Sequence, residues 1–233
     1  MTNIVRKNKF CLVDGFDDYL VEGATFEGKF AIPKILGTSP SLVSNIEYFV
    51  PFSQRKRVPK EIRSKVGVCF FEHDVKFHDF ELNPNDYLAE LREFAADISP
   101  DNSMYTDDPL SVQLINLYRN RAYGYYMEKN GINVIPNIRW GDSRSYGLNE
   151  FGEAWAFSGA PHESVIAVGS YGCIRGKEAS TEFRNGLKSA MKILSPKLVL
   201  VYGPMPERLF EEVRHLASFV HYDDWTKFKH KCA

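Results

Sequence analysis

Residues 99–140, SPDNSMYTDDPLSVQLINLYRNRAYGYYMEKNGINVIPNIRW, carry the clearest fold signals of the chain. Asp108 and Pro109 are typical of the start of a helix, and Gly131 is typical of its end. The β-rich run 132–138 follows this glycine at once. A polar turn, a long helix and a strand in this order predict part of a βαβ unit, in which a helix joins two parallel strands.

The same alternation of strand and helix signals continues through most of the chain. β-rich runs predict strands at residues 30–35, 46–50, 66–71, 95–98, 132–138, 165–170, 198–202 and 219–222. From the third run onward, helical spacing of apolar residues lies between most of them, in segments that begin near residues 84, 109, 183 and 206. This alternation predicts an α/β fold with a mostly parallel sheet built from βαβ units. A two-sided sheet and an incomplete or irregular TIM-like barrel both fit the pattern.

The length and composition are those of a chain with a sizeable core. It has 233 residues, of which 44% are apolar and 25% are charged. We expect a single α/β domain over residues 1–233, with an α/β core at 66–225 and an N-terminal portion at 1–65. The segment 141–161 is rich in glycine and aromatic residues and lacks a helical stripe. Loops of this length are usually functional or mobile.

Charge and cysteine usage exclude several classes of protein. The net charge of −1 gives no global positive field that would attract DNA, RNA or an acidic membrane, so any nucleic-acid contact has to be local. The four cysteines contain no C-x-x-C pair, which argues against a disulfide framework and a cysteine zinc site. The apolar run 10–13 is too short for a signal peptide, and no run approaches the roughly 18 apolar residues of a membrane helix. We therefore expect a cytoplasmic protein with free thiols and no membrane partner.

Polar side chains follow the predicted strands, which is where parallel α/β proteins bind ligands. Asp74 and Asp101 are the candidate acid/base residues. The candidate ligand-binding residues are Arg121, Asn137, Arg139, Trp140, Ser170 and Tyr202. Some of these aspartate and serine residues are explained as caps of the following helix. The polar residues that capping does not explain predict a pocket.

Arg121 falls inside the apolar stripe of the predicted helix, beside Leu117 and Tyr118. The same stripe includes Leu110. A buried guanidinium needs a partner, because an unpaired charge inside a protein is very unfavourable. Two partners fit: an internal carboxylate such as Asp101, which would tie a strand to the helix, or an anionic group of a ligand.

Asn137, Arg139 and Trp140 stand at the end of a predicted strand, after Pro136. Alternate residues of a strand face the same side, so Asn137 and Arg139 share a face. An amide beside a guanidinium can hold a phosphate or a carboxylate while the tryptophan borders a base or another ring. An exposed arginine next to a tryptophan in the core would have the same sequence.

Two other segments offer weaker chemistry. The turn GSYGC, Gly169–Cys173, carries a thiol, but no phosphate-loop pattern follows it and the sequence places no base beside Cys173. His73 and His78 lie among carboxylates, but their spacing matches no metal-binding helix motif and on a strand they face opposite sides. We assign no metal ligands, and the sequence names no cofactor.

Local basic charge is concentrated in SQRKRVPKEIRSK, residues 53–65, where six basic residues meet one glutamate. Arg55, Lys56 and Arg57 are the candidate nucleic-acid contacts in this segment. Such runs also occur as solvated loops without a partner. If they do bind phosphate, the affinity should fall steeply with salt.

Several segments together resemble a family of bacterial, phage and mobile-element proteins of unknown function. These segments are GVCFFEHDVKF, SPDNSMYTDDPL, NLYRNRAYGYY, GINVIPNIRWGDSRSY, VIAVGSYGC, FRNGL and PKLVLVYG. They span about residues 66–203, and their order and spacing make the resemblance specific, although each motif alone is weak. The resemblance implies a phage or mobile-element setting and no particular activity.

Two hypotheses of function follow. In the first, the protein is an enzyme or degenerate enzyme that takes a phosphate-bearing small molecule or nucleotide through Arg121, Asn137 and Arg139, with Asp101 or Asp74 as acid or base. In the second, it is a non-catalytic accessory protein that binds nucleic acid or a host protein through its basic segment and aromatic loops. A purely structural protein fits poorly with so many polar strand ends.

Overall fold

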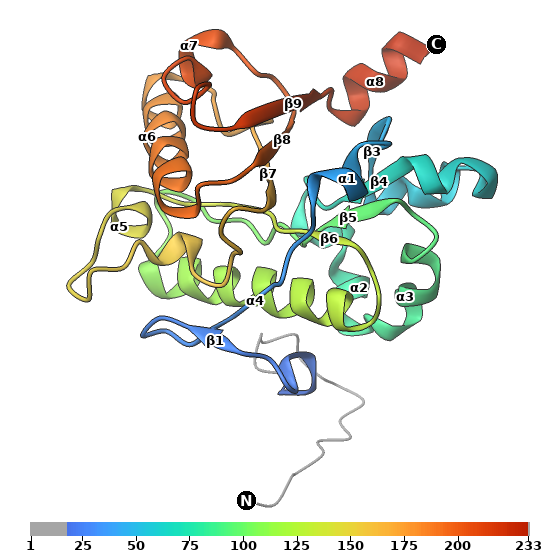
Figure 1. The fold of residues 1–233 in the computed structure, drawn as a ribbon, viewed down its shortest axis with the longest axis horizontal. Coiled ribbons are helices and arrows are strands. Elements are labelled where there is room, and N and C mark those ends of the chain that lie inside the picture. The colour runs from blue at the N-terminus through green and yellow to red at the C-terminus, as the bar shows by residue number, and fades with distance from the viewer. Residues whose placement is uncertain (1–17, 233) are drawn as a thin grey trace, which may run out of the picture.

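Parallel strands form the centre of the molecule in the computed structural model, which describes residues 18–232 (Figure 1). The first sheet has the order β3-β4-β5-β6, with β3 Tyr48–Pro51, β4 Val66–Cys69, β5 Ala96–Ile98 and β6 Val134–Ile135. The second has the order β7-β8-β9, with β7 Val165–Gly169, β8 Leu198–Tyr202 and β9 Ser218–Tyr222. All neighbouring strands in both sheets are parallel. The α/β fold with mostly parallel strands is confirmed.

The two sheets are joined at one isolated parallel bridge, between Asn137 and Ala167. Here the Ala167 amide donates to the Pro136 carbonyl at 2.9 Å, and the Ile138 amide donates to the Ala167 carbonyl at 2.8 Å. The predicted strand 132–138 is therefore divided between the sheets. Pro136 explains the division, because proline has no N–H to continue the ladder with β5.

The strands do not close into a barrel. Their order through the bridge runs from β3 to β9, and within residues 18–232 no strand ladder joins β9 back to β3. The cluster of buried side chains between the sheets nevertheless includes at least one residue from each of the seven parallel strands. The structure is thus a pair of parallel sheets around a shared core, without barrel closure.

Helical segments connect the strands in chain order. Between β3 and β4 lie η2 (Phe52–Arg57) and η3 (Lys60–Lys65); between β4 and β5 lie η4 (Asp74–Lys76), α2 (His78–Leu82) and α3 (Asn85–Leu91). Then come α4 (Leu110–Lys129) after β5, α5 (Ser143–Tyr146) and η5 (Trp155–Phe157) after β6, α6 (Lys177–Leu194) after β7, α7 (Glu207–Phe210) after β8 and α8 (Trp225–Cys232) after β9. In Figure 1, α4 runs along the lower side of the molecule and α6 stands beside the second sheet. None of the described helices combines the length and apolar character that a membrane span requires.

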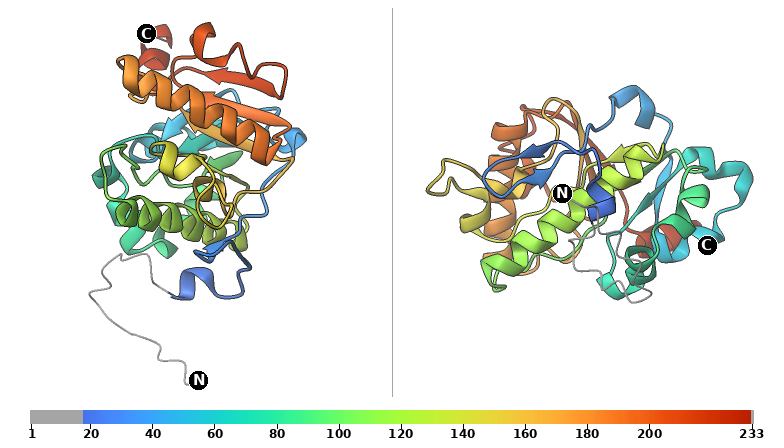
Figure 2. Two further views of the ribbon diagram at one scale, coloured as in Figure 1. Left: turned by 90° about the vertical axis from the view of Figure 1, so that its left-hand side faces the viewer. Right: turned by 90° about the horizontal axis from the view of Figure 1, so that it is seen from below.

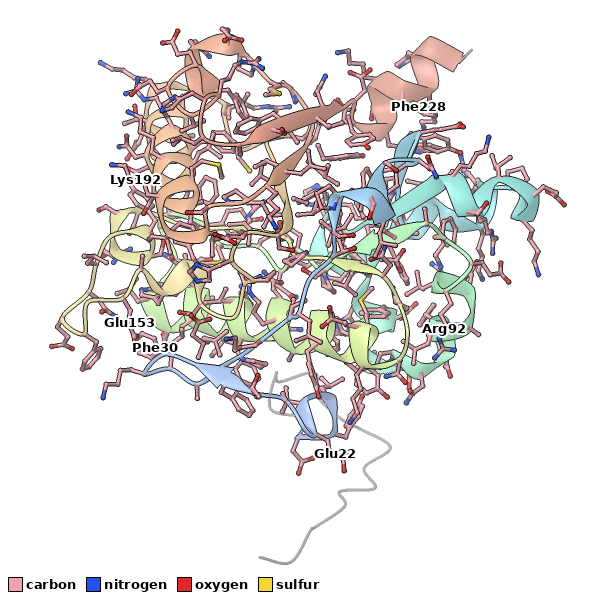
Figure 3. The ribbon with its side chains drawn as sticks, in the orientation of Figure 1. Glu22, Phe30, Arg92, Glu153, Lys192 and Phe228 are labelled. Carbon is pink, nitrogen blue, oxygen red and sulfur yellow. The ribbon has the colours of Figure 1, made fainter. Side chains whose placement is uncertain are left out.

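The N-terminal elements lie outside the parallel sheets. They are η1 (Asp18–Val21), the antiparallel pair β1 (Phe26–Glu27) and β2 (Ile32–Pro33), and α1 (Pro40–Val43). Of these, η1 and β2 contact α4, whereas Val43 of α1 packs into the core between the sheets. Figure 3 shows Phe30 and Glu153 close together, where the Lys29 amide donates to the Glu153 carboxylate. The strand predicted at 30–35 is therefore only a short hairpin strand. The apolar run 10–13 and Cys11 lie outside the described residues, and the single-domain organisation stays a prediction.

The buried face of α4 differs from the predicted stripe. Leu117 and Arg121 are buried as predicted, but Leu110 is 39% exposed, and Gln113 and Asn120, outside the predicted stripe, are fully buried. The reason is that α4 is covered on several sides, since it contacts η1, β2 and β6 (Figure 2, right). A projection that assumes one buried face cannot describe such a helix.

Candidate functional site

A cavity of about 870 Å³ lies at the carboxyl edge of the two sheets. Residues at or just after the end of every parallel strand contribute to its lining: Pro51, Phe71, Asp101, Arg139, Gly169, Tyr202 and Asp224. This is the edge at which parallel α/β proteins bind ligands, because all of the connecting loops on this side meet there. We call it the strand-end cavity.

Asp101 is the buried carboxylate of the cavity wall, with only 5% of its surface exposed. One of its oxygens accepts a hydrogen bond from the Asn137 amide at 2.6 Å, and the other accepts from the Arg139 guanidinium at 3.0 Å. Burial raises the pKa of Asp101, although Arg139 and Asn137 partly offset this effect. Asn137 and Arg139 therefore share a face and meet at one carboxylate. Of these three residues, Arg139 and Asp101 line the cavity and Asn137 does not.

Arg121 has a different environment from the one expected. Its guanidinium donates to the backbone carbonyls of Asn137 at 2.8 Å, Ser158 at 3.1 Å and Ala156 at 3.5 Å. Burial lowers its pKa to about 10, while the charge of Glu27 opposes the shift. The predicted pairing with a carboxylate such as Asp101 is wrong, because the hydrogen-bond acceptors are three backbone carbonyls, one after β6 and two in or next to η5. A ligand contact at Arg121 stays a prediction. Arg121 does not line the cavity.

Trp140 and Tyr202 both line the cavity. The Trp140 indole N–H donates to the Glu182 carbonyl at 3.2 Å, which fixes the ring against α6. The Tyr202 ring stacks on Phe71 with centroids 5.3 Å apart, and its hydroxyl accepts from the Trp225 amide at 2.8 Å. These aromatic rings are held in place before any ligand binds.

Asp74 and Ser170 lie behind the cavity surface rather than on it. The Asp74 carboxylate accepts from the amide and hydroxyl of Ser103, at 3.2 and 2.8 Å. The Ser170 hydroxyl donates to the Pro204 carbonyl at 2.6 Å. Both side chains fasten the loops after the strands, and Ser103 itself lines the cavity.

The basic segment is largely neutralised within the fold. Arg55 is buried, pairs with Glu90 at 2.8 Å and donates to the Phe52 carbonyl, so its guanidinium is not available to nucleic acid. Lys56 is exposed but lies outside the cavity lining, whereas Arg57 is exposed and lines the cavity. Of the three candidate contacts, Arg57 alone belongs to the candidate site.

Sequence reasoning missed Lys76, Arg175 and Trp225, which also line the cavity. They lie seven, six and three residues after the ends of β4, β7 and β9. The strand-end rule that selected Arg139 would have selected them if it had included seven residues after each strand.

The two histidines near β4 take different surroundings. His73 lines the cavity, whereas the His78 ring nitrogen lies 3.6 Å from the carboxylate of Glu81. Among residues 18–232, no group of three or more histidine, cysteine, aspartate or glutamate side chains is arranged to hold a metal ion. Cys173 lines the cavity and is half-buried.

Comparison with known proteins places the chain in a family. It is 32% identical over 136 residues to the Gene 1 protein of Mycobacterium phage L5, a match that covers 58% of this chain and 56% of the relative. It is 29% identical over 134 residues to the Gene 1 protein of Mycobacterium phage D29, covering 58% of this chain and 47% of the relative. The matches thus span about half the length of these relatives, and no solved structure matches the chain. Because the family model matches residues 24–223, the chain belongs to the domain of unknown function DUF4417.

Proposed function

We propose that the strand-end cavity binds a phosphate-bearing small molecule or nucleotide, with Arg139 as its main anion contact. The proposal rests on the position and the hydrogen bonding of this guanidinium. Asp101 is its one hydrogen-bond partner among residues 18–232, and the side chain lines the cavity. The planar fork of arginine matches the oxygens of a phosphate, and its other N–H groups are free of partners in the described part of the chain.

Asp101 would act first as a positioning residue in this proposal. Its buried carboxylate fixes the plane of Arg139, while Asn137 holds the other oxygen. It is also the predicted acid/base residue that reaches the cavity, since Asp74 lies behind Ser103. A raised pKa would suit Asp101 for proton transfer, so an acid/base step at this residue stays a prediction.

The proposal is tested by thermal unfolding with a panel of ligands. Nucleoside mono-, di- and triphosphates should raise the midpoint, and the parent nucleosides should not. At a ligand concentration 100 times Kd, binding adds about 2.7 kcal/mol, which corresponds to roughly 5–10 °C for a chain of this size. Arg139→Met should abolish the shift.

Arg214→Met is the matched control, because Arg214 pairs with Glu207 on α7 and lies outside the cavity lining. It should leave the ligand response unchanged. An equal shift with nucleosides, or an undiminished shift in Arg139→Met, would contradict the proposal. Analysis of the ligand after incubation separates an enzyme from a binding protein, because only an enzyme converts it to product.

A further inference from the structure

The charged residues around the strand-end cavity are not balanced. Its basic lining residues are Arg57, Lys76, Arg139, Arg175 and Lys229, and its acidic ones are Glu72, Asp101, Glu182 and Asp224. Every acidic group already has a donor: the Ser53 amide and hydroxyl for Glu72, Arg139 for Asp101, the Tyr146 hydroxyl for Glu182, and the Thr226 and Lys227 amides for Asp224. Within residues 18–232, no basic lining residue other than Arg139 has an ion-pair partner. The cavity lining therefore carries five basic side chains against four acidic ones, and four of the five basic side chains have no ion-pair partner among the described residues.

These cations without an ion-pair partner come from four separate segments after the strands. Arg57 follows β3, Lys76 follows β4, Arg175 follows β7 and Lys229 belongs to α8, which follows β9. β4 and β7 are three positions apart in strand order, which is roughly 14 Å along the sheets at about 4.8 Å per strand. This spacing of the strands favours separate phosphate contacts for Lys76 and Arg175. A ligand with several phosphates at intervals fits cations that are spread in this way.

Two of the cations lie over aromatic rings, of which Tyr171 is exposed and Trp225 is half-buried against Phe228. Arg175 lies 5.8 Å from the ring centroid of Tyr171, and Lys229 lies 5.8 Å from that of Trp225. Tyr171 is 52% exposed, and Tyr105, on another loop of the cavity, is 55% exposed. A cation beside an exposed aromatic ring fits one nucleotide, because the cation contacts the phosphate and the ring stacks on the base. Arg175 and Tyr171 form such a pair, and Tyr105 offers a second exposed ring, which fits a short run of nucleotides.

We infer that the strand-end cavity takes a segment of single-stranded nucleic acid, rather than a free nucleotide alone. This inference rests on the proposed function and specifies its ligand class. The cavity is concave and its aromatic faces need unstacked bases, so a duplex, whose bases stack on one another, would not satisfy them. Arg139 would bind one phosphate at the floor, and the cations on the loops would bind its neighbours along the strand.

The experiment measures affinity against length. Labelled oligo(dT) and oligo(U) of 2, 4, 8 and 12 nucleotides are titrated by fluorescence anisotropy, and dTMP and a 12-base-pair duplex are used as competitors. Affinity should rise from dTMP to about four nucleotides and then level off. The slope of log K against log salt should be roughly −3 for about four contacted phosphates.

Variants at exposed positions assign the contacts. The double substitution Arg175→Ala and Lys229→Ala should weaken binding at least tenfold and reduce the salt slope by about 1.4. Tyr171→Leu should weaken binding about 5- to 100-fold with little change in the slope, because it removes stacking rather than charge. Lys192→Ala combined with Arg214→Ala is the matched control, since both side chains lie outside the cavity lining; Lys192 is labelled on α6 in Figure 3. Equal thermal midpoints for all variants exclude a folding defect.

Three results overturn the inference. If dTMP binds as tightly as the longer strands and the double variant behaves as wild type, the cavity is a small-molecule site and only the proposed function survives. If the duplex competes as well as the single strand, the inference that the aromatic rings stack on unpaired bases is wrong. If neither mononucleotides nor oligonucleotides bind, the inference and the proposed function both fail.

Discussion

Arg121→Met tests whether the buried arginine of α4 is a structural clamp. Arg121 is completely buried, and its guanidinium holds carbonyls from the segment after β6 and from the region of η5. Methionine retains most of the length and the flexible apolar stem, but it donates no hydrogen bond. The substitution therefore leaves the Asn137 and Ser158 carbonyls without their donor.

The expected loss of stability follows from these bonds. The contacts at 2.8 and 3.1 Å are hydrogen bonds from a charged donor, each contributing about 1.5–3 kcal/mol, and the contact at 3.5 Å adds little. The substitution also removes the free-energy cost of burying the guanidinium charge, which offsets part of this loss. We expect the free energy of unfolding to fall by about 3–5 kcal/mol.

Urea denaturation followed by tryptophan fluorescence and circular dichroism measures this loss. The unfolding midpoint should fall by roughly 1–3 M, while Arg214→Met, which removes an exposed ion pair, should change stability by less than about 1 kcal/mol. A loss below about 1 kcal/mol for Arg121→Met would refute the clamp. Wild-type stability together with loss of ligand binding would instead restore Arg121 as a ligand contact.

Three other substitutions probe the core. Asp97 is fully buried and has no ion pair in the described residues; burial raises its pKa well above the ordinary value, and a weak hydrogen bond from the Val68 backbone and the charge of Arg55 offset this only in part. Above about pH 4 the unfolded chain therefore loses this proton while the folded chain keeps it, and the folded state becomes less stable as the pH rises. Relative to Asp97→Asn, the unfolding constant of the wild type should rise tenfold per pH unit, which denaturation at several pH values measures. Gly186→Ala should cost about 1–3 kcal/mol in urea unfolding, with a changed tryptophan emission, because a Cβ there would overlap the Trp140 indole. Glu128→Gln should cost about 1–3 kcal/mol in thermal unfolding, because the half-buried carboxylate accepts the Leu36 and Gly37 amides at 2.8 and 2.9 Å.

The parallel fold could be predicted because its signals are local. Strand runs such as 165–170 and 198–202 are apolar on both faces, as expected for strands covered by helices on one side and by the shared core on the other. The order of the strands then fixes which loops meet, and this is why Asp101 and Arg139, 38 residues apart, share a hydrogen bond. The strand-end rule needs only the sequence of elements.

The partner of Arg121 could not be predicted because it is not a side chain. Its three acceptors are backbone carbonyls of segments that have no regular ladder at those positions, and backbone groups have no signature in the sequence. The fate of Arg55 escaped prediction for a similar reason. Its partner Glu90 comes from α3, 35 residues away, and a run of basic letters does not show which members are neutralised by a neighbouring helix.

The position of Arg121 also links the fold to the proposed site. The two sheets are joined by a single bridge at Asn137, and Arg121 binds the carbonyl of that residue while the Asn137 side chain holds Asp101. A chain of contacts thus runs from the helix α4, through the joint between the sheets, to the carboxylate that orients Arg139. A ligand held by Arg139 and by loops of both sheets would add bonds across a joint that has few of its own. The geometry of the anion contact and the relative position of the sheets therefore depend on the same residues, so a substitution that loosens the joint should also weaken binding without touching the ligand.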